Sequence, residues 1–222
     1  MTIAKYLHSC LLLTLDGKRL LFDPGSFSFA DGSVAVEDLP RVDYLVITHD
    51  HPDHHDPDAL RAIVDRDRPE LVTNGELAAT LRDRGYTVTE HEAGERTFGP
   101  FRLEAVNVPH EPILSDRVPR LTAYCVNGTV LNPGDSFAET LLRFRGVPLL
   151  CLPIMAPFLT ERRAYDFAVR MAPGAVLPVH DGYAKEYFAR ARQEAFRDWL
   201  GREGIDFHGL LAAGEGLSLE NK

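Results

Sequence analysis

The chain reads Thr48-His49-Asp50-His51-Pro52-Asp53-His54-His55-Asp56 at the end of a β-branched run that covers residues 42–48. Such a run predicts a short buried strand, so this stretch lies where a strand ends. With 9 histidines in 222 residues, a seven-residue window should hold roughly 0.3 of one, yet residues 49–55 hold four. Composition alone therefore does not explain the cluster.

The spacing inside this stretch favours metal binding. His49 and His51 lie two apart on an extended strand, so both side chains leave the same face and one cation can touch both. A helical zinc motif would separate them by four instead. Pro52 then turns the chain and lets Asp53 and His54 point to a second position. The arrangement suits two metals, and the competing interpretation is a solvated, acidic, histidine-rich turn.

Three later residues extend the set of metal donors. His110, Asp135 and His180 each follow a predicted strand, and functional sites collect in such loops. Taken singly, each is typical of a turn or cap. Together with the four donors of the first stretch they make seven nitrogen and carboxylate ligands. Seven are enough for two borderline metals with an open position for water.

The rest of the chain predicts an α/β protein. Asp16-Gly17 and Asn127-Gly128 are turn sequences that predict two hairpins, and residues 24–40 form a long loop. Hairpins mixed with strand–helix alternation indicate two mixed sheets covered by helices, in one domain spanning residues 1–222. Strands are predicted at residues 3–15, 19–22, 42–48, 71–73, 87–90, 101–108, 121–126, 129–131, 147–152, 175–179 and 207–211, and helices at 59–66, 76–84, 137–144, 160–171 and 184–200.

Composition narrows the class of protein. The chain is 45% hydrophobic and 26% charged, which are ordinary globular values, and its net charge of −9 argues against a nucleic-acid partner. The apolar stretch at residues 10–15 is too short for a membrane span or a secretory signal, so we expect a cytoplasmic protein with no membrane partner. Cys10, Cys125 and Cys151 each lie in an apolar run and are expected to be reduced core residues.

These motifs resemble those of the metallo-β-lactamase-fold hydrolases, and the resemblance spans nearly the whole chain. It rests on His49-x-His51-x-Asp53-His54 together with Leu20-Leu-Phe-Asp-Pro-Gly25, which looks like the family's first motif. The resemblance implies a four-layer αββα sandwich with the site at one edge of the paired sheets. It also implies that Asp23 supports the metal-binding loop without touching the metals.

The family pattern also assigns the ligands. It implies that His49, His51 and His110 bind one metal, that Asp53, His54 and His180 bind the other, and that Asp135 bridges both. The stretches Tyr6-Leu-His-Ser-Cys10 and Leu152-Pro-Ile-Met-Ala-Pro157 resemble the branch that contains ascorbate-6-phosphate lactonase. In that branch His8 would line the pocket, and the alternative is a hydrogen-bonded histidine at a strand edge.

The expected activity is hydrolysis by two divalent metals, with zinc expected and manganese or iron also compatible with the ligands. Such metals lower the pKa of a shared water and present hydroxide to a carbonyl or phosphorus centre, while Asp53 or Asp135 takes up the proton. The expected substrate is a small, anionic ester, lactone or phosphodiester.

Several segments are expected to form the substrate pocket, and bases within or beside them to hold an anionic group. Arg117, Arg120 and Lys185 are the candidate bases, unless they are solvated surface charges. The candidate walls are Phe27, Phe29, residues 113–120, residues 155–159 and Tyr183.

Two other functions compete with this hydrolase. One is a mononuclear-iron oxidoreductase similar to the persulfide dioxygenases, whose iron would be held by His49, His51, His110 and Asp135. The other is a metal-stabilised scaffold without chemistry. Two relatives are disfavoured, because Asp135 stands where classical β-lactamases have cysteine and because flavodiiron members have glutamate at the position of His51.

Overall fold

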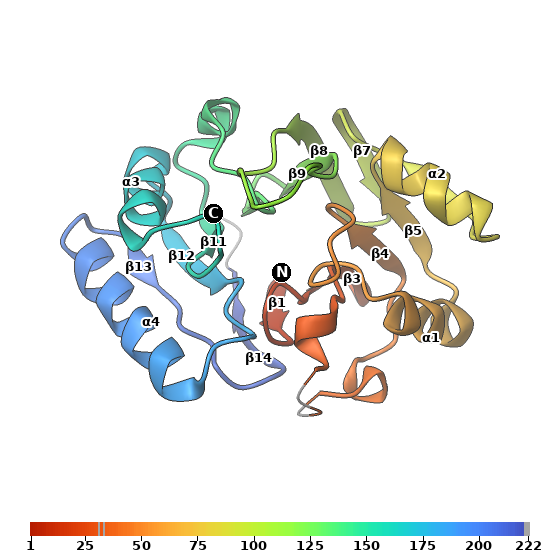
Figure 1. Ribbon diagram of the computed structural model, residues 1–222, viewed down its shortest axis with the longest axis horizontal. Coiled ribbons are helices and arrows are strands. Elements are labelled where there is room, and N and C mark those ends of the chain that lie inside the picture. The colour runs from red at the N-terminus through yellow and green to blue at the C-terminus, as the bar shows by residue number, and fades with distance from the viewer. Residues whose placement is uncertain (31, 33, 220–222) are drawn as a thin grey trace.

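Two β-sheets face each other in the centre of the molecule, and helices cover their outer faces. The structure, a computed structural model, describes residues 1–30, 32 and 34–219. Figure 1 shows α1 (Pro57–Asp67) and α2 (Gly75–Asp83) on one side and α3 (Glu161–Met171) and α4 (Glu186–Gly201) on the other, with the strands between them. In the described ranges, no helix is both long and apolar enough to cross a membrane.

Each sheet has seven strands and is mixed. The first runs, in spatial order, β14 (Glu215–Ser218), β1 (Thr2–Lys5), β2 (Leu11–Leu15), β3 (Lys18–Phe22), β4 (Tyr44–Ile47), β5 (Glu70–Thr73) and β6 (Val88–Glu90). The second runs β13 (Asp206–Phe207), β12 (Ala175–Val179), β11 (Leu149–Pro153), β10 (Val130–Asn132), β9 (Leu121–Val126), β8 (Phe101–Val108) and β7 (Gly94–Phe98). Three short 3-10 helices, η1 (Ser26–Ser28), η2 (Val36–Asp38) and η3 (Glu139–Phe144), lie in the connections.

Both predicted hairpins are present. Asp16 and Gly17 have φ of 49° and 75°, and Asn127 and Gly128 have φ of 52° and 65°. Positive φ at both central residues is the mark of the tight turn whose twist matches paired strands, and asparagine, aspartate and glycine tolerate it best. Each turn joins an antiparallel pair, β2 with β3 and β9 with β10.

Three hydrophobic cores separate the four layers. The central core packs the two sheets together through residues such as Phe22, Phe101 and Tyr124. A second core lies under α1 and α2 and includes Leu60 and Leu77, and the third lies under α3 and α4. Burial of apolar area at about 25 cal/mol per Å² is the main stabilising term for such layers. The predicted αββα sandwich is confirmed.

Three predicted elements differ from the structure, and strand β7 was not among the predictions. The expected strand at 3–15 is two strands, because the chain turns at Leu7 and His8, whose φ values are 61° and 46°. The expected helix at 137–144 is the 3-10 helix η3, and the strand expected at 207–211 is limited to the short β13. Strand β7 was not predicted, since its residues are mostly exposed on a sheet edge and lack an apolar alternation.

The strand directions bring the candidate residues to one edge. In the first sheet β1 and β3 are both antiparallel to β2, and β4 is parallel to β3. In the second sheet β8 and β10 are both antiparallel to β9, and β12 follows β10 through the parallel β11. The carboxyl ends of β1, β3, β4, β8, β10 and β12 therefore carry the loops that contain His8, Asp23, residues 49–54, His110, Asp135 and His180.

Candidate metal centre

The first group of candidate metal ligands comes from three loops. His49 and His51 follow β4, His110 follows β8 and Asp135 follows β10, and one ligand atom from each lies within 4.8 Å of the others. His49 and His51 share this group, as their spacing on an extended chain predicted. His51 is half-buried and lines a cavity, whereas the other three side chains are buried.

The second group adjoins the first. It contains His8, Asp53, His54 and His180, again with ligand atoms within 4.8 Å of one another. Asp135 lies between the groups: its Oδ2 is 3.8 Å from Nε2 of His49 and 3.2 Å from Nε2 of His180, and its Oδ1 is 3.3 Å from Nε2 of His54. One carboxylate therefore faces histidines of both groups.

The donor atoms of this centre fit divalent cations. Nε2 of His49, Nε2 of His54 and Oδ1 of Asp135 are buried without a hydrogen-bond partner in the described part of the chain. A buried polar atom left unpaired costs about 1–3 kcal/mol, so three that converge call for a ligand. Imidazole nitrogen with carboxylate oxygen is a donor set that suits zinc, manganese or iron.

Asp23 orients two of the histidines. Its carboxylate accepts hydrogen bonds from the Thr48 backbone N–H and hydroxyl, both at 2.8 Å, and from Nδ1 of His54 at 3.0 Å. Because the Thr48 hydroxyl donates to Asp23, it accepts from Nδ1 of His49 at 2.9 Å. Both imidazoles thus carry their proton on Nδ1 and present a free Nε2 to the centre, which is how an outer carboxylate prepares metal ligands.

Thr48 was not assigned a role from the sequence. The signal for it was its hydroxyl immediately before His49, at the end of the strand. Glu111 was missed in the same way, although it directly follows His110. Its N–H donates to the carbonyl of Asp135 at 2.9 Å, its Oε1 accepts from the Phe137 N–H at 3.0 Å, and its carboxylate pairs with Arg163. Glu111 therefore ties the His110 loop to the Asp135 loop.

His8 holds Asp53 in place. The Gly182 backbone N–H donates to Nδ1 of His8 at 3.1 Å, so the proton of the neutral ring is on Nε2, which donates to Oδ2 of Asp53 at 3.1 Å. Burial, aided by His180, lowers the pKa of His8 to about 4, so the ring is neutral at pH 7. A nitrogen that carries a proton does not ligate, and His8 is thus suited to position Asp53. A Cβ at Gly182 would lie 2.7 Å from Cβ of His8, which explains the glycine.

The carboxylates of Asp53 and Asp135 stabilise the protonated form of neighbouring histidines. Burial disfavours charge on His180, but Asp135 and Asp53 raise its pKa to about 9. His54 behaves alike: burial opposes its charge, and Asp135 and Asp23 raise its pKa well above the ordinary value. Burial alone would raise the pKa of the Asp53 and Asp135 carboxyl groups, but nearby histidines hold both values below the usual range. A divalent cation would satisfy the same attraction.

Non-glycine residues with positive φ are concentrated near the candidate ligands. Leu7, His8, Asp23 and His180 have φ of 61°, 46°, 47° and 65°, a region that non-glycine residues occupy at a cost of about 1–3 kcal/mol each. Gly25 adds a close approach, because a Cβ there would lie 1.9 Å from the carbonyl oxygen of Asp53. The loop after β3 can therefore lie directly against the loop that carries the candidate ligands Asp53 and His54.

A cavity of about 260 Å³ opens onto both groups. The predicted wall residues that line it are Phe27, Ile113, Pro157, Phe158 and Tyr183, with Pro52 in addition. Phe29 instead packs against the core under α1 and α2.

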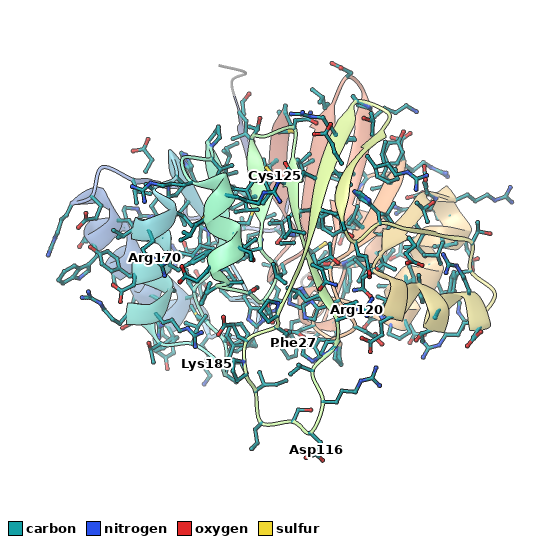
Figure 2. The ribbon with its side chains drawn as sticks, turned by 90° about the horizontal axis from the view of Figure 1, so that it is seen from above. Phe27, Asp116, Arg120, Cys125, Arg170 and Lys185 are labelled. Atoms are coloured by element: carbon teal, nitrogen blue, oxygen red, sulfur yellow. The ribbon has the colours of Figure 1, made fainter. Side chains whose placement is uncertain are left out.

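The three candidate bases are not among the residues that line the cavity. Lys185 is exposed at the residue before α4, while Arg117 and Arg120 pair with Glu76 and Glu92. Figure 2 shows Arg120 and Lys185 to either side of Phe27, and the loop that carries Asp116 extending beyond this edge. These positions fit the interpretation as solvated surface charges, whereas a role in holding an anionic group stays a prediction.

Comparison with known proteins agrees with this architecture. The family model described as the beta-lactamase superfamily domain matches residues 2–180. Protein Rv0786c of Mycobacterium tuberculosis is 29% identical over 188 residues, which are 81% of this chain and 84% of that protein. A UPF0173 metal-dependent hydrolase of Caldivirga maquilingensis is 28% identical over 183 residues, 78% of each chain. The solved structure of Igni18, a metallo hydrolase of Ignicoccus hospitalis, has a TM-score of 0.76 at 20% identity and covers 100% of this chain and 99% of that one.

Proposed function

This chain belongs to the beta-lactamase superfamily, and on that premise we propose that it is a hydrolase that works with two divalent metal ions, zinc being the expected metal. The family relation and the similarity to a named metal-dependent hydrolase make it a metal-dependent hydrolase. The number of ions, the roles of individual residues and the substrate are the proposal.

We assign the ligands by the two groups of side chains. His49, His51 and His110 hold one ion, while Asp53, His54 and His180 hold the other. The observation that carries the proposal is the position of Asp135, whose two oxygens lie 3.2–3.8 Å from histidine nitrogens of both groups. A carboxylate placed in this way suits a bridge between two cations.

The chain's own residues then direct the reaction. When bound, two divalent ions supply an activated water and neutralise negative charge that develops on the substrate. The Asp53 side chain is 17% exposed and that of Asp135 only 3%, so Asp53 is the carboxylate that can reach a proton in the cavity. His8 keeps Asp53 in that position. The substrate is a small ester, lactone or phosphodiester.

Metal content tests this function. We expect plasma mass spectrometry of protein purified without added metal to find about two zinc or manganese ions per chain. His49→Ala and His180→Ala should each reduce the content, because each removes a ligand from one group. His208→Ala, a histidine outside both groups, is the matched control and should leave the content unchanged.

Three outcomes would change the assignment. About one iron per chain, lost in His49→Ala and kept in His180→Ala, together with oxygen consumption, would support the mononuclear-iron oxidoreductase. Protein that binds no metal even after reconstitution would overturn the proposal. Turnover that survives Asp53→Ala unchanged would contradict the role given to that carboxylate.

A further inference from the structure

The wall of the cavity above the metal ligands is apolar. Leaving the five candidate ligands aside, six described residues line it: Phe27, Pro52, Ile113, Pro157, Phe158 and Tyr183. They come from five separate loops, so the apolar character is not the property of one hydrophobic segment. Ligand pockets of this kind bind the non-reacting part of a substrate by apolar contact and use few polar groups for orientation.

Three aromatic rings surround the ligating histidines. The Phe158 ring lies edge-on to His110 and His180, with centroid distances of 5.8 and 5.7 Å. Phe27 and Tyr183 form a second pair with centroids 5.6 Å apart. These two side chains are 38% and 47% exposed. Large aromatic side chains held open at a cavity offer area that a planar ligand can bury.

Positive charge is lacking along this wall. Among the described residues, those that line the cavity include no lysine or arginine. Arginines on the neighbouring elements pair with carboxylates instead: Arg117 with Glu76, Arg120 with Glu92 and Arg163 with Glu111. A negatively charged substituent placed against this wall would thus lose its hydration without gaining a lysine or arginine partner, which is unfavourable.

Tyr183 supplies the polar group of the wall. A tyrosine phenol has an ordinary pKa of about 10, so the hydroxyl is neutral at pH 7. A neutral hydroxyl can donate one hydrogen bond to an uncharged oxygen and accept another. It therefore suits a carbonyl, ether or alcohol oxygen better than a carboxylate or phosphate that needs a cation.

We infer that the site hydrolyses small, uncharged esters or lactones whose non-reacting part is an apolar ring, and that it discriminates against anionic substituents there. This inference rests on the proposed function and narrows its substrate class. In the reaction water adds its oxygen to the acyl carbon, the bond from that carbon to the leaving oxygen breaks, and the leaving oxygen takes a proton. An ester gives an acid and an alcohol or phenol, and a lactone gives one hydroxy acid; no oxidant or reductant is consumed.

Paired substrates test the inference on metal-loaded protein. Phenyl acetate and 4-acetoxybenzoate share the reacting ester, but the second carries a carboxylate on the far side of the ring. We expect kcat/KM for phenyl acetate to exceed that for 4-acetoxybenzoate by about tenfold or more, since the carboxylate of the second substrate would lie unpaired against the apolar wall. The carboxylate makes the phenol a better leaving group, so intrinsic reactivity works against the expected preference.

Matched variants and a binding measurement separate the wall from the metals. Phe27→Leu should weaken binding of 2-naphthylmethanol several-fold in calorimetry on metal-free protein and should lower kcat/KM for phenyl acetate. Phe188→Leu is the control, because Phe188 is 47% exposed on α4 and lies outside the cavity. Tyr183→Phe should reduce the affinity for the alcohol and leave that for naphthalene unchanged.

The outcomes distinguish the inference from the proposed function. Equal or better turnover of 4-acetoxybenzoate, or equal effects of Phe27→Leu and Phe188→Leu, would overturn the inference while the hydrolase stands. Intact binding of 2-naphthylmethanol with no turnover of any ester, lactone or phosphodiester by protein containing two metal ions would overturn the proposed function instead, and the substrate class with it.

Discussion

Replacing Asp23 with asparagine tests whether an outer carboxylate sets the protonation of two proposed metal ligands. The substitution keeps the shape of the side chain, and asparagine tolerates the φ of 47° found at this position. It therefore changes the hydrogen-bonding character of the side chain with little effect on the backbone. Asp23 is buried, so water does not replace what is lost.

The expected magnitude follows from three hydrogen bonds. Oδ1 of Asp23 accepts from the Thr48 backbone N–H, while Oδ2 accepts from the Thr48 hydroxyl and from Nδ1 of His54. In the variant the amide oxygen keeps the backbone N–H, and the amide NH₂ faces two groups that were donors. His54 must then move its proton to Nε2, the atom that faces the proposed metal. Loss of such a partner typically costs 10- to 100-fold in metal affinity, or about 1.4–2.7 kcal/mol.

The assay is competition with a chelating dye at pH 7, together with urea unfolding of the metal-free protein. Asp43→Asn is the matched control, because Asp43 also accepts a backbone N–H, from Arg19 at 2.9 Å, but belongs to neither ligand group. We expect weaker metal binding in Asp23→Asn alone. Unchanged metal affinity in a folded Asp23→Asn protein, or an equal loss in the control, would refute the reasoning.

Three further predictions concern single side chains. Lys5→Met should lower the free energy of urea unfolding by about 3–5 kcal/mol, because it leaves the buried Asp181 carboxylate without the ammonium group that donates to it at 2.6 and 2.8 Å. Recovery of the lost stability in Lys5→Met/Asp181→Leu would support this cause, and a loss below about 1 kcal/mol would contradict it. His8→Phe should weaken one of two metal sites in a stoichiometric titration and spare the other, since it removes the donor to Asp53; equal weakening of both would be against it. Asp67→Asn should destabilise the protein at neutral pH and have little effect in strong acid. Burial opposes the charge of Asp67, but hydrogen bonds lower the pKa of its carboxyl in the folded protein. The carboxylate therefore contributes its full stabilisation above about pH 4, and this stabilisation is lost as pH falls through the lowered pKa of the folded protein. A stability difference that does not depend on pH would exclude this linkage.

Local sequence determined most of the elements and the grouping of the candidate ligands that follow β4. Side-chain direction along one strand is a local property, so the spacing of His49 and His51 placed them in one group, and the turn at Pro52 sent Asp53 and His54 to the other. Turn chemistry determined the two hairpins in the same way. Strand β7 was not predicted, because its residues are mostly exposed at the edge of a sheet and therefore show no apolar periodicity.

Tertiary structure decided how these parts meet. His8 and Gly182 lie 174 positions apart, and their contact sets the tautomer that makes His8 a donor to Asp53. The placement of Asp135 between two groups of histidines likewise depends on how the two sheets face each other. Arg117 and Arg120 pair with Glu76 and Glu92 and do not line the cavity, whose wall is apolar. Sequence spacing does not encode these ion pairs, because the partners lie on distant elements. The grouping of candidate ligands at the end of one strand is encoded along that strand. The protonation of these side chains, the position of Asp135 and the charge of the pocket arise where loops from different strands come together.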